Sequence, residues 1–282
     1  MKFHFNTAEI YIPDDVSVKE ALARTTHLCI AAHQDDIEIM AAQPIIECFQ
    51  KDDKWFTGVV VTNGRGSPRN GIYEKYSDDE MREVRFKEQR KAAIVGEFSA
   101  QIMLDYPSSI VKDGSQSIVV DDILSVLEAT QPNFVYTHNP ADKHTTHVGV
   151  VMRVLKALRS LDGENQPQQV YGCEVWRNLD WMRDAEKVVM DNSAQKNLQA
   201  ALLGVFDSQI SGGKRYDLAA MGRRIANATF FESHDVDETS DLSYAMNLTP
   251  LMQNHDLNIT EYVKSFINRF SDDVENLIAE VM

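Results

Sequence analysis

Histidine and aspartate are concentrated in two short segments of the sequence, 33–38 (HQDDIE) and 138–147 (HNPADKHTTH). Each segment follows a run of apolar residues typical of a buried strand. Within each segment, two side chains able to bind a metal stand three residues apart, which brings them to one side of a first helical turn. These residue types at this spacing predict a divalent-metal centre.

The ligands predicted for this centre are His33, Asp36 and His147. Two imidazoles and one carboxylate leave an open coordination position, as in catalytic zinc sites, where the pKa of a bound water falls to about 7. Asp35 is a spare carboxylate that can accept the proton of that water, and His144 is a spare imidazole that can donate to a leaving group or an oxyanion. The same ligand types also bind Fe²⁺ in oxygenases, so they leave the identity of the metal open.

The elements that must position these residues alternate along the chain. This alternation predicts an α/β fold with a Rossmann-like, mostly parallel, doubly wound sheet flanked by helices. Ligands of such sheets bind beyond the carboxyl ends of the strands, where both segments fall. Apolar runs predict strands at 27–32, 57–62, 101–104, 134–138 and 169–176, and helices are expected at 37–49, 78–95, 120–129 and 146–161.

The last third of the chain is predicted to be more helical, with helices at 194–210, 217–233 and 260–280. Residues 234–258 show little periodicity, so we expect an extended connection or lid there. We predict one domain over residues 1–282, with a core at about 26–233 and a helical C-terminal extension at about 234–282. The apolar stripe of the last helix is expected to pack on its own domain, although a homo-oligomer stays open.

Composition narrows the classes of partner. The 282 residues include 43 acidic and 28 basic side chains, a net charge of −15, which argues against a nucleic acid or an anionic membrane as partner. The three cysteines are scattered and are expected to be buried and reduced. The first residues do not resemble a signal peptide, and no apolar run approaches the ~20 residues of a membrane helix. We therefore expect a cytoplasmic protein.

Several motifs resemble those of the PIG-L/LmbE family of zinc-dependent N-deacetylases. Ala32 to Glu38 (AHQDDIE) is similar to the family motif A-H-P-D-D-x-E, and Asp142 to His147 (DKHTTH) is similar to D-x-H-P-D-H. The helix from Arg85 to Ala92 resembles the motif R-x-x-E-x-x-x-A, and Thr62-Asn63-Gly64 resembles a T-x-G loop. The likeness extends over residues 26–233.

The resemblance implies a Rossmann-like fold and hydrolysis of an N-acetyl group, on a small N-acetylglucosamine-type amino sugar or its conjugate. Carried over by position, His33, Asp36 and His147 would bind Zn²⁺, or Fe²⁺ or another divalent cation. Asp35 would be the general base, and His144 the general acid or oxyanion partner.

Three positions depart from the family pattern: Gln34 replaces the usual Pro, Thr146 replaces an Asp, and Arg65 follows Gly64 where many relatives carry Glu. Thr146 has no charge to orient His144, a role that Asp142 or His138 could fill. Arg65 adds a positive charge near the mouth of the site. Arg85 falls where the family has a substrate-contacting arginine. The candidate substrate-binding residues are Arg85, Arg65 and Asp142.

Two other functions stay open on the sequence. The same residues could serve a metal-dependent amidase acting on a thiol conjugate. Alternatively, loss of the Asp at Thr146 could mark a catalytically impaired family member that acts as a binding protein. Four aromatic residues could stack on a sugar ring, although aromatics at such positions usually belong to the core; they are Tyr106, Tyr171, Trp176 and Trp181.

Overall fold

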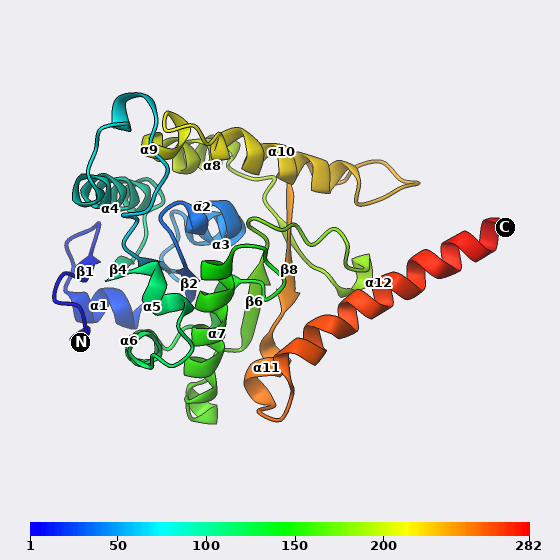
Figure 1. The fold of residues 1–282 in the computed structure, drawn as a ribbon, viewed down its shortest axis with the longest axis horizontal. Coiled ribbons are helices and arrows are strands. Elements are labelled where there is room, and N and C mark those ends of the chain that lie inside the picture. Colours follow the sequence, from blue (N-terminus) through cyan, green and yellow to red (C-terminus); the bar gives the residue numbers. More distant parts are fainter.

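The computed structural model describes residues 1–282 and contains one sheet of eight strands (Figure 1). Five parallel strands form its centre in the spatial order β4-β3-β2-β5-β6, and three strands paired in antiparallel fashion extend its two edges. The predicted doubly wound α/β fold is therefore confirmed. The strands are β1 (Glu9–Tyr11), β2 (His27–Ala31), β3 (Phe56–Thr62), β4 (Ala100–Tyr106), β5 (Phe134–His138), β6 (Gln169–Cys173), β7 (Val188–Asp191) and β8 (Leu242–Asn247).

Helices cover both faces of the sheet because the central strands are apolar on both sides. Along β2, Leu28 and Ile30 face one core, while Cys29 and Ala31 face the other. The first core lies under α1 (Val18–Ala23), α5 (Ser108–Lys112), α6 (Ile118–Thr130), α7 (Thr145–Arg159) and α11 (Thr249–Gln253). The second lies under α2 (Asp36–Met40), α3 (Ala42–Cys48), α4 (Asp78–Val95) and α8 (Lys196–Gly204).

The order of the strands creates a switch point between β2 and β5. The chain runs from β2 to β3 on one side of the sheet and later returns to place β5 on the other side of β2. Connections that diverge in this way leave a crevice beyond the carboxyl ends of the two strands. Both histidine-rich segments begin there, one after β2 and one at the end of β5.

Three expectations are corrected by the structure, one of them the helix expected at 194–210, which is divided at Val205 and Phe206. The helix expected at 37–49 is divided at Ala41 into α2 and α3, because Pro44 lacks an N–H and its ring would clash with the carbonyl of Met40 in a continuous helix. The stretch 234–258 is not only a connection, since it contains β8 and α11. Strand β8 pairs with β6 and β7, and its alternate residues Leu242, Tyr244 and Met246 enter the core.

The C-terminal third adds α9 (Asp207–Ile210), α10 (Tyr216–Thr229) and α12 (Ile259–Val281). Helix α12 projects away from the rest of the molecule, and of its residues only Phe266 is buried (Figure 1). The three cysteines are buried and unpaired, as expected. None of the helices has both the length and the apolar character needed to cross a bilayer. Short 3₁₀ turns occur at Gly71–Tyr73, Gly163–Asn165 and Asp184–Glu186.

Candidate metal centre and active site

The loop after β2 places the first two predicted ligands side by side. The backbone N–H of His33 donates to Asp36 Oδ2 over 2.7 Å, and His33 Nδ1 lies 3.1 Å from the same oxygen. Between them, Asp35 adopts a left-handed conformation with φ = 90°, which a residue with a side chain reaches only at a cost. This turn directs Asp35 and Asp36 to different places at the start of α2.

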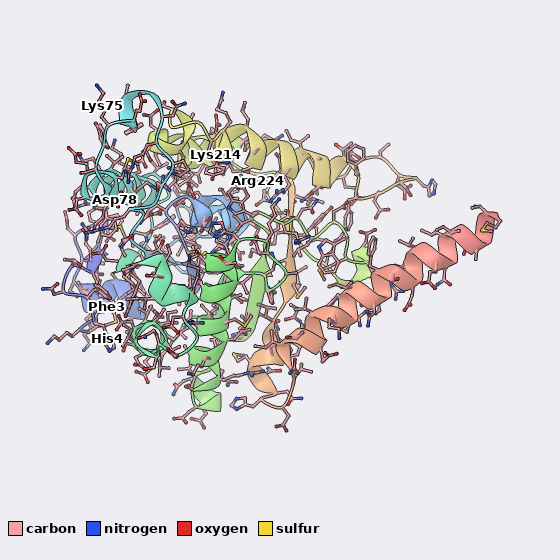
Figure 2. All side chains as sticks on the ribbon, viewed as in Figure 1. Phe3, His4, Lys75, Asp78, Lys214 and Arg224 are labelled. Carbon is pink, nitrogen blue, oxygen red and sulfur yellow. The ribbon has the colours of Figure 1, made fainter.

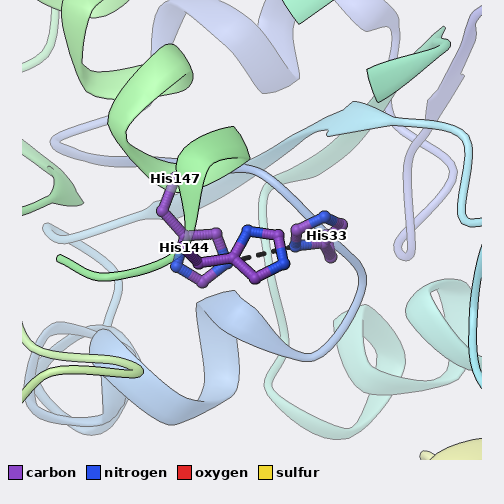
Figure 3. Close-up of side chains that lie close together, drawn as sticks. All are labelled: His33, His144 and His147. Atoms are coloured by element: carbon purple, nitrogen blue, oxygen red, sulfur yellow. Dashed lines mark hydrogen bonds between the residues drawn. The ribbon is translucent and has the colours of Figure 1, made fainter. Parts of the chain in front are cut away.

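The third predicted ligand comes from α7 and closes a triangle of donor atoms. His147 Nε2 lies 3.1 Å from His33 Nδ1 (Figure 3) and 3.3 Å from Asp36 Oδ2. Donor atoms about 2.1 Å from one zinc ion lie roughly 3.4 Å apart when the geometry is tetrahedral. The three atoms are therefore spaced as one divalent ion requires. His144 could join His33 and His147 in a second, overlapping set of ligands.

Two buried neighbours fix the proton positions of this triangle. His147 Nδ1 lies 3.2 Å from Asp142 Oδ2, so the carboxylate accepts its N–H and leaves Nε2 free to bind a metal. The backbone N–H of Ala32 donates to His138 Nε2 over 2.8 Å. Because that lone pair is occupied, His138 supports the loop and is a poorer ligand than His33 or His147.

The buried carboxylates around the triangle favour a positive charge at its centre. Burial raises the pKa of Asp36, but the His147 and His33 imidazoles outweigh it and hold that pKa well below its ordinary value. Burial lowers the pKa of His147, but Asp36 and Asp142 outweigh it and raise that pKa to about 9. The negative charges of the two buried carboxylates are thus balanced by a protonated imidazole. A bound divalent ion would balance these charges in its place.

Asp35 belongs to a separate ion-pair chain. Arg85 Nη2 donates to Asp35 Oδ2 over 2.9 Å, and Arg85 Nη1 donates to Glu88 Oε2 over 3.1 Å. Ser208 of α9 donates its backbone N–H to Glu88, which links α4 and α9 to the site. Burial raises the pKa of Asp35 to about 6 against the opposing effect of Arg85. Asp35 lines the cavity, and its Oδ1 carries no hydrogen bond.

A cavity of about 640 Å³ opens above these residues. His33, Asp35, Asp36 and His144 line its floor, while His147 is fully buried behind them. The His144 ring packs 5.0 Å from the His33 ring and 4.5 Å from the His147 ring, measured between centroids. Burial, with His147 and His33 nearby, lowers the pKa of His144 to about 4.

The family described as "PIG-L: GlcNAc-PI de-N-acetylase" matches residues 28–158. This range contains both histidine-rich segments and the whole triangle of donor atoms. Residues 28–158 form a PIG-L family domain. No curated protein sequence matches the chain.

Several solved structures share the fold of this chain. N,N′-diacetylchitobiose deacetylase from Pyrococcus horikoshii is 16% identical, with a TM-score of 0.62 over 82% of this chain and 86% of its own. The zinc-inhibited form of teicoplanin deacetylase is 14% identical, with a TM-score of 0.56 over 79% of this chain and 97% of its own. The hydratase GalB from Pseudomonas putida KT2440, which acts on 4-carboxy-2-hydroxymuconate, is 15% identical, with a TM-score of 0.58 over 79% and 96%. At these identities, the likeness establishes the fold alone.

Two of the three residues expected to contact substrate do not line the cavity. Arg65 is exposed, and its Nη2 pairs with Asp79 Oδ1 at 2.8 Å. Asp142 is buried, and it accepts hydrogen bonds from His147 and from the backbone N–H groups of His144 and Trp176. Neither residue lines the cavity, so we reinterpret Asp142 as a support for His147. Arg85 does line the cavity, although Asp35 and Glu88 already engage it.

The other departures from the family pattern have simple structural outcomes. Gln34 Nε2 donates to the carbonyl of Thr62 over 3.0 Å, which ties the loop after β2 to the end of β3. This contact restrains the turn where relatives carry a proline. Thr146 lines the cavity, but its hydroxyl forms no hydrogen bond with His144. The neighbouring carboxylate Asp142 reaches the backbone of His144 rather than its ring.

Residues outside the motifs complete the walls of the cavity. Trp176 lies with its ring centroid 6.0 Å from that of His144, and Tyr216 of α10 packs edge-on against Trp176. Tyr106, Tyr171 and Trp181, considered with Trp176 in the sequence, do not line it. Four basic side chains do; Lys143 lies within the second motif, and the others are Lys112, Lys214 and Arg223. Spacing in the sequence could not show that they meet, because the fold brings them together from separate segments.

Proposed function

We propose that this protein is a metal-dependent N-deacetylase that removes the acetyl group from an amino sugar of the N-acetylglucosamine type or from its conjugate. The observation that supports this most is the meeting of His33 Nδ1, Asp36 Oδ2 and His147 Nε2 within 3.3 Å of one another, beside a carboxylate with a free oxygen. These three residues would hold the ion, and we propose zinc. When bound, a divalent ion polarises the acyl carbonyl and acidifies water.

The side chains around the metal centre divide the remaining work. Asp35 accepts the proton of the attacking water at its free oxygen, while Arg85 holds the other oxygen in place. His144 donates a hydrogen bond to the oxyanion that forms at the acyl carbon. When the C–N bond breaks, the nitrogen takes up the proton that Asp35 received, so acetic acid and a free amine are the products. Trp176 offers a face on which a sugar ring can stack.

The proposal is tested by loading the purified protein with Zn²⁺, Fe²⁺, Mn²⁺ or Co²⁺ and measuring acetate release from a panel of substrates. The panel includes N-acetylglucosamine, its glycosides and phosphates, and an acetylated amino sugar joined to a thiol. We expect one ion per chain and turnover of at least one amino-sugar substrate. Turnover of the thiol conjugate alone would favour the amidase. A stoichiometrically loaded protein that hydrolyses nothing would favour a binding protein.

Asp35→Asn separates chemistry from metal binding. General-base catalysis contributes about 10²- to 10⁴-fold to a rate, so we expect kcat to fall by that order in this variant. The metal content should stay at the wild-type value, because Asp35 is not among the ligands. The matched control is Asp79→Asn, an exposed carboxylate paired with Arg65. Normal turnover by Asp35→Asn would refute the assigned role.

A further inference from the structure

The mouth of the cavity carries a concentration of positive charge in an otherwise acidic protein. We define this cationic mouth as Lys112, Lys143, Lys214 and Arg223, all of which line the cavity. The whole chain has a net charge of −15. The only acidic residues among those that line the cavity are Asp35 and Asp36, both on its floor. The local charge of the mouth is therefore positive, whereas the net charge of the molecule is negative.

The three lysines of the mouth form no ion pair. Lys112, Lys143 and Lys214 are exposed and have no carboxylate within 4.0 Å of their amines, whereas Arg223 donates a hydrogen bond to the carbonyl of Val175. Lys143 lies between β5 and α7, Lys214 lies between α9 and α10, and Lys112 ends α5. Figure 2 shows Lys214 at the start of α10. Like charges brought together from separate segments repel one another, so an arrangement of this kind suits a bound anion.

Trp176 relates the lysines to the reaction centre. Lys143 Nζ lies 5.9 Å and Lys214 Nζ lies 5.3 Å from the centre of the Trp176 ring, which packs 6.0 Å from the His144 ring. Both ammonium groups and the ring of a catalytic candidate therefore lie within about 6 Å of one aromatic ring. A sugar ring stacked on Trp176 with its acetamide towards His144 would present a substituent to both lysines.

Screening decides whether the overall negative charge would prevent anion binding. At physiological ionic strength the Debye length is about 8 Å, so the distant carboxylates of the surface are largely screened. Ammonium groups in direct contact with a phosphate or carboxylate form charge-assisted hydrogen bonds, which are about twice as strong as neutral ones. The local lysines therefore dominate the interaction once an anion is in the cavity.

We propose that the substrate carries an anionic group, a phosphate or a carboxylate, next to its acetylated amino sugar, and that Lys143 and Lys214 bind this group beside Trp176. Lys112 and Arg223 complete the positive surround. This inference rests on the proposed deacetylase function for the position of the acetamide. It adds a property that the metal centre does not determine, namely the charge of the substrate.

Binding is measured on the zinc-loaded Asp35→Asn protein, in which turnover is suppressed. N-acetylglucosamine, its 1-phosphate, its 6-phosphate and the corresponding uronic acid are titrated by calorimetry, with tryptophan fluorescence as a second readout. We expect at least one charged sugar to bind about tenfold more tightly than N-acetylglucosamine, with an advantage that shrinks as salt is added. The phosphates and the uronic acid distinguish the two sources of charge. Equal affinities for the neutral and all charged sugars would overturn the inference.

Lysine variants locate the contact. We expect Lys143→Gln and Lys214→Gln each to reduce the preference for the charged sugar about five- to tenfold, and the double variant to abolish it. The control is Lys51→Gln, an exposed lysine between α3 and β3 at the other edge of the sheet. An undiminished preference in the double variant would overturn the assignment.

The outcomes also separate this inference from the proposed function. Hydrolysis of neutral and charged sugars with equal kcat/KM, together with equal binding, would refute the anion site and leave the deacetylase standing. Lysine-dependent binding of the charged sugar without acetate release from any substrate by the zinc-loaded wild-type protein would support the anion site and refute the deacetylase.

Discussion

At the scale of single residues, Asp142 supports the proposed metal centre through His147. Its Oδ2 accepts the N–H of His147 Nδ1 over 3.2 Å, which fixes the tautomer that leaves Nε2 available. Carboxylates in this position orient the imidazole and increase its basicity, and their loss typically costs about 10- to 100-fold in metal affinity. Asp142→Asn should therefore weaken zinc binding by that factor, measured by competition with a chelator.

The control for this prediction is Asp79→Asn, which removes a carboxylate from the surface. Asp142 also accepts backbone N–H groups from His144 and Trp176, so the melting temperature of the metal-free protein is recorded for each variant. Wild-type zinc affinity in a folded Asp142→Asn protein would show that His147 does not depend on this carboxylate.

The loop that follows β3 belongs to the next scale, that of the elements. Gly64 has φ = 71°, and a Cβ there would lie 2.6 Å from Gln34 Oε1 and 3.0 Å from Arg85 Cγ. An alanine would therefore be strained by its backbone and would push on the residues that hold Asp35. We expect Gly64→Ala to cost about 1–2 kcal/mol, a fall of roughly 3–6 °C in Tm, and to lower kcat.

Gly66→Ala is the matched control, because a Cβ at that position meets no atom within 4 Å. Its Tm should stay near the wild-type value in the same thermal scan. Equal Tm values for the two alanine variants would show that the loop relaxes around Gly64 at no cost.

His27 is the first residue of β2, at the amino end of the strand and far from the metal centre at its carboxyl end. Its ring is buried against Phe134, with centroids 4.9 Å apart, and near Glu47 and Lys54. Burial lowers the pKa of His27, and the nearby carboxylate of Glu47 opposes that effect only in part. The neutral form is therefore favoured in the folded state. Its contribution to stability is complete above the unfolded pKa of about 6.5 and declines as the pH falls below it.

We expect the urea midpoint of the wild-type protein to fall more between pH 7.5 and pH 5.5 than that of His27→Phe, which has no group to protonate at this position. Both proteins are measured without metal, so that ligand protonation affects them equally. A steeper fall for His27→Phe would contradict the stated direction of the shift.

Strand ends were predictable from the sequence where burial on both faces makes a strand continuously apolar. The range 134–138 predicted for β5 is the observed one, and His33 and His147 lie together because both follow such strands. Strand β8 escaped prediction because its six residues alternate and follow a long polar segment. The cationic mouth escaped it for another reason, since Lys143 and Lys214 are far apart in the sequence and only the fold brings both near Trp176.

At the scale of the whole molecule, the long helix α12 makes few buried contacts with the rest of the fold. Phe266 is its only buried residue, and the ion pair between Arg183 and Asp273 is its last anchor along the chain. Beyond Asp273 every residue is exposed, with Val274 at 40%, Leu277 at 64% and Val281 at 87%. Removing residues 274–282 therefore takes away little buried surface, and we expect Tm to change by less than about 2 °C.

Phe266→Ala provides the contrast, because truncating a buried phenylalanine costs about 3–5 kcal/mol and should lower Tm by roughly 6 °C or more. Both proteins are melted at two concentrations and sized by gel filtration. A loss of stability on removing 274–282 that grows with concentration would show that the exposed apolar residues of α12 are covered by a second copy of the chain. A loss independent of concentration would show that they pack on their own domain after all. An unchanged Tm, with an unchanged elution volume, would mean that residues 274–282 contribute neither to self-association nor to packing on their own domain.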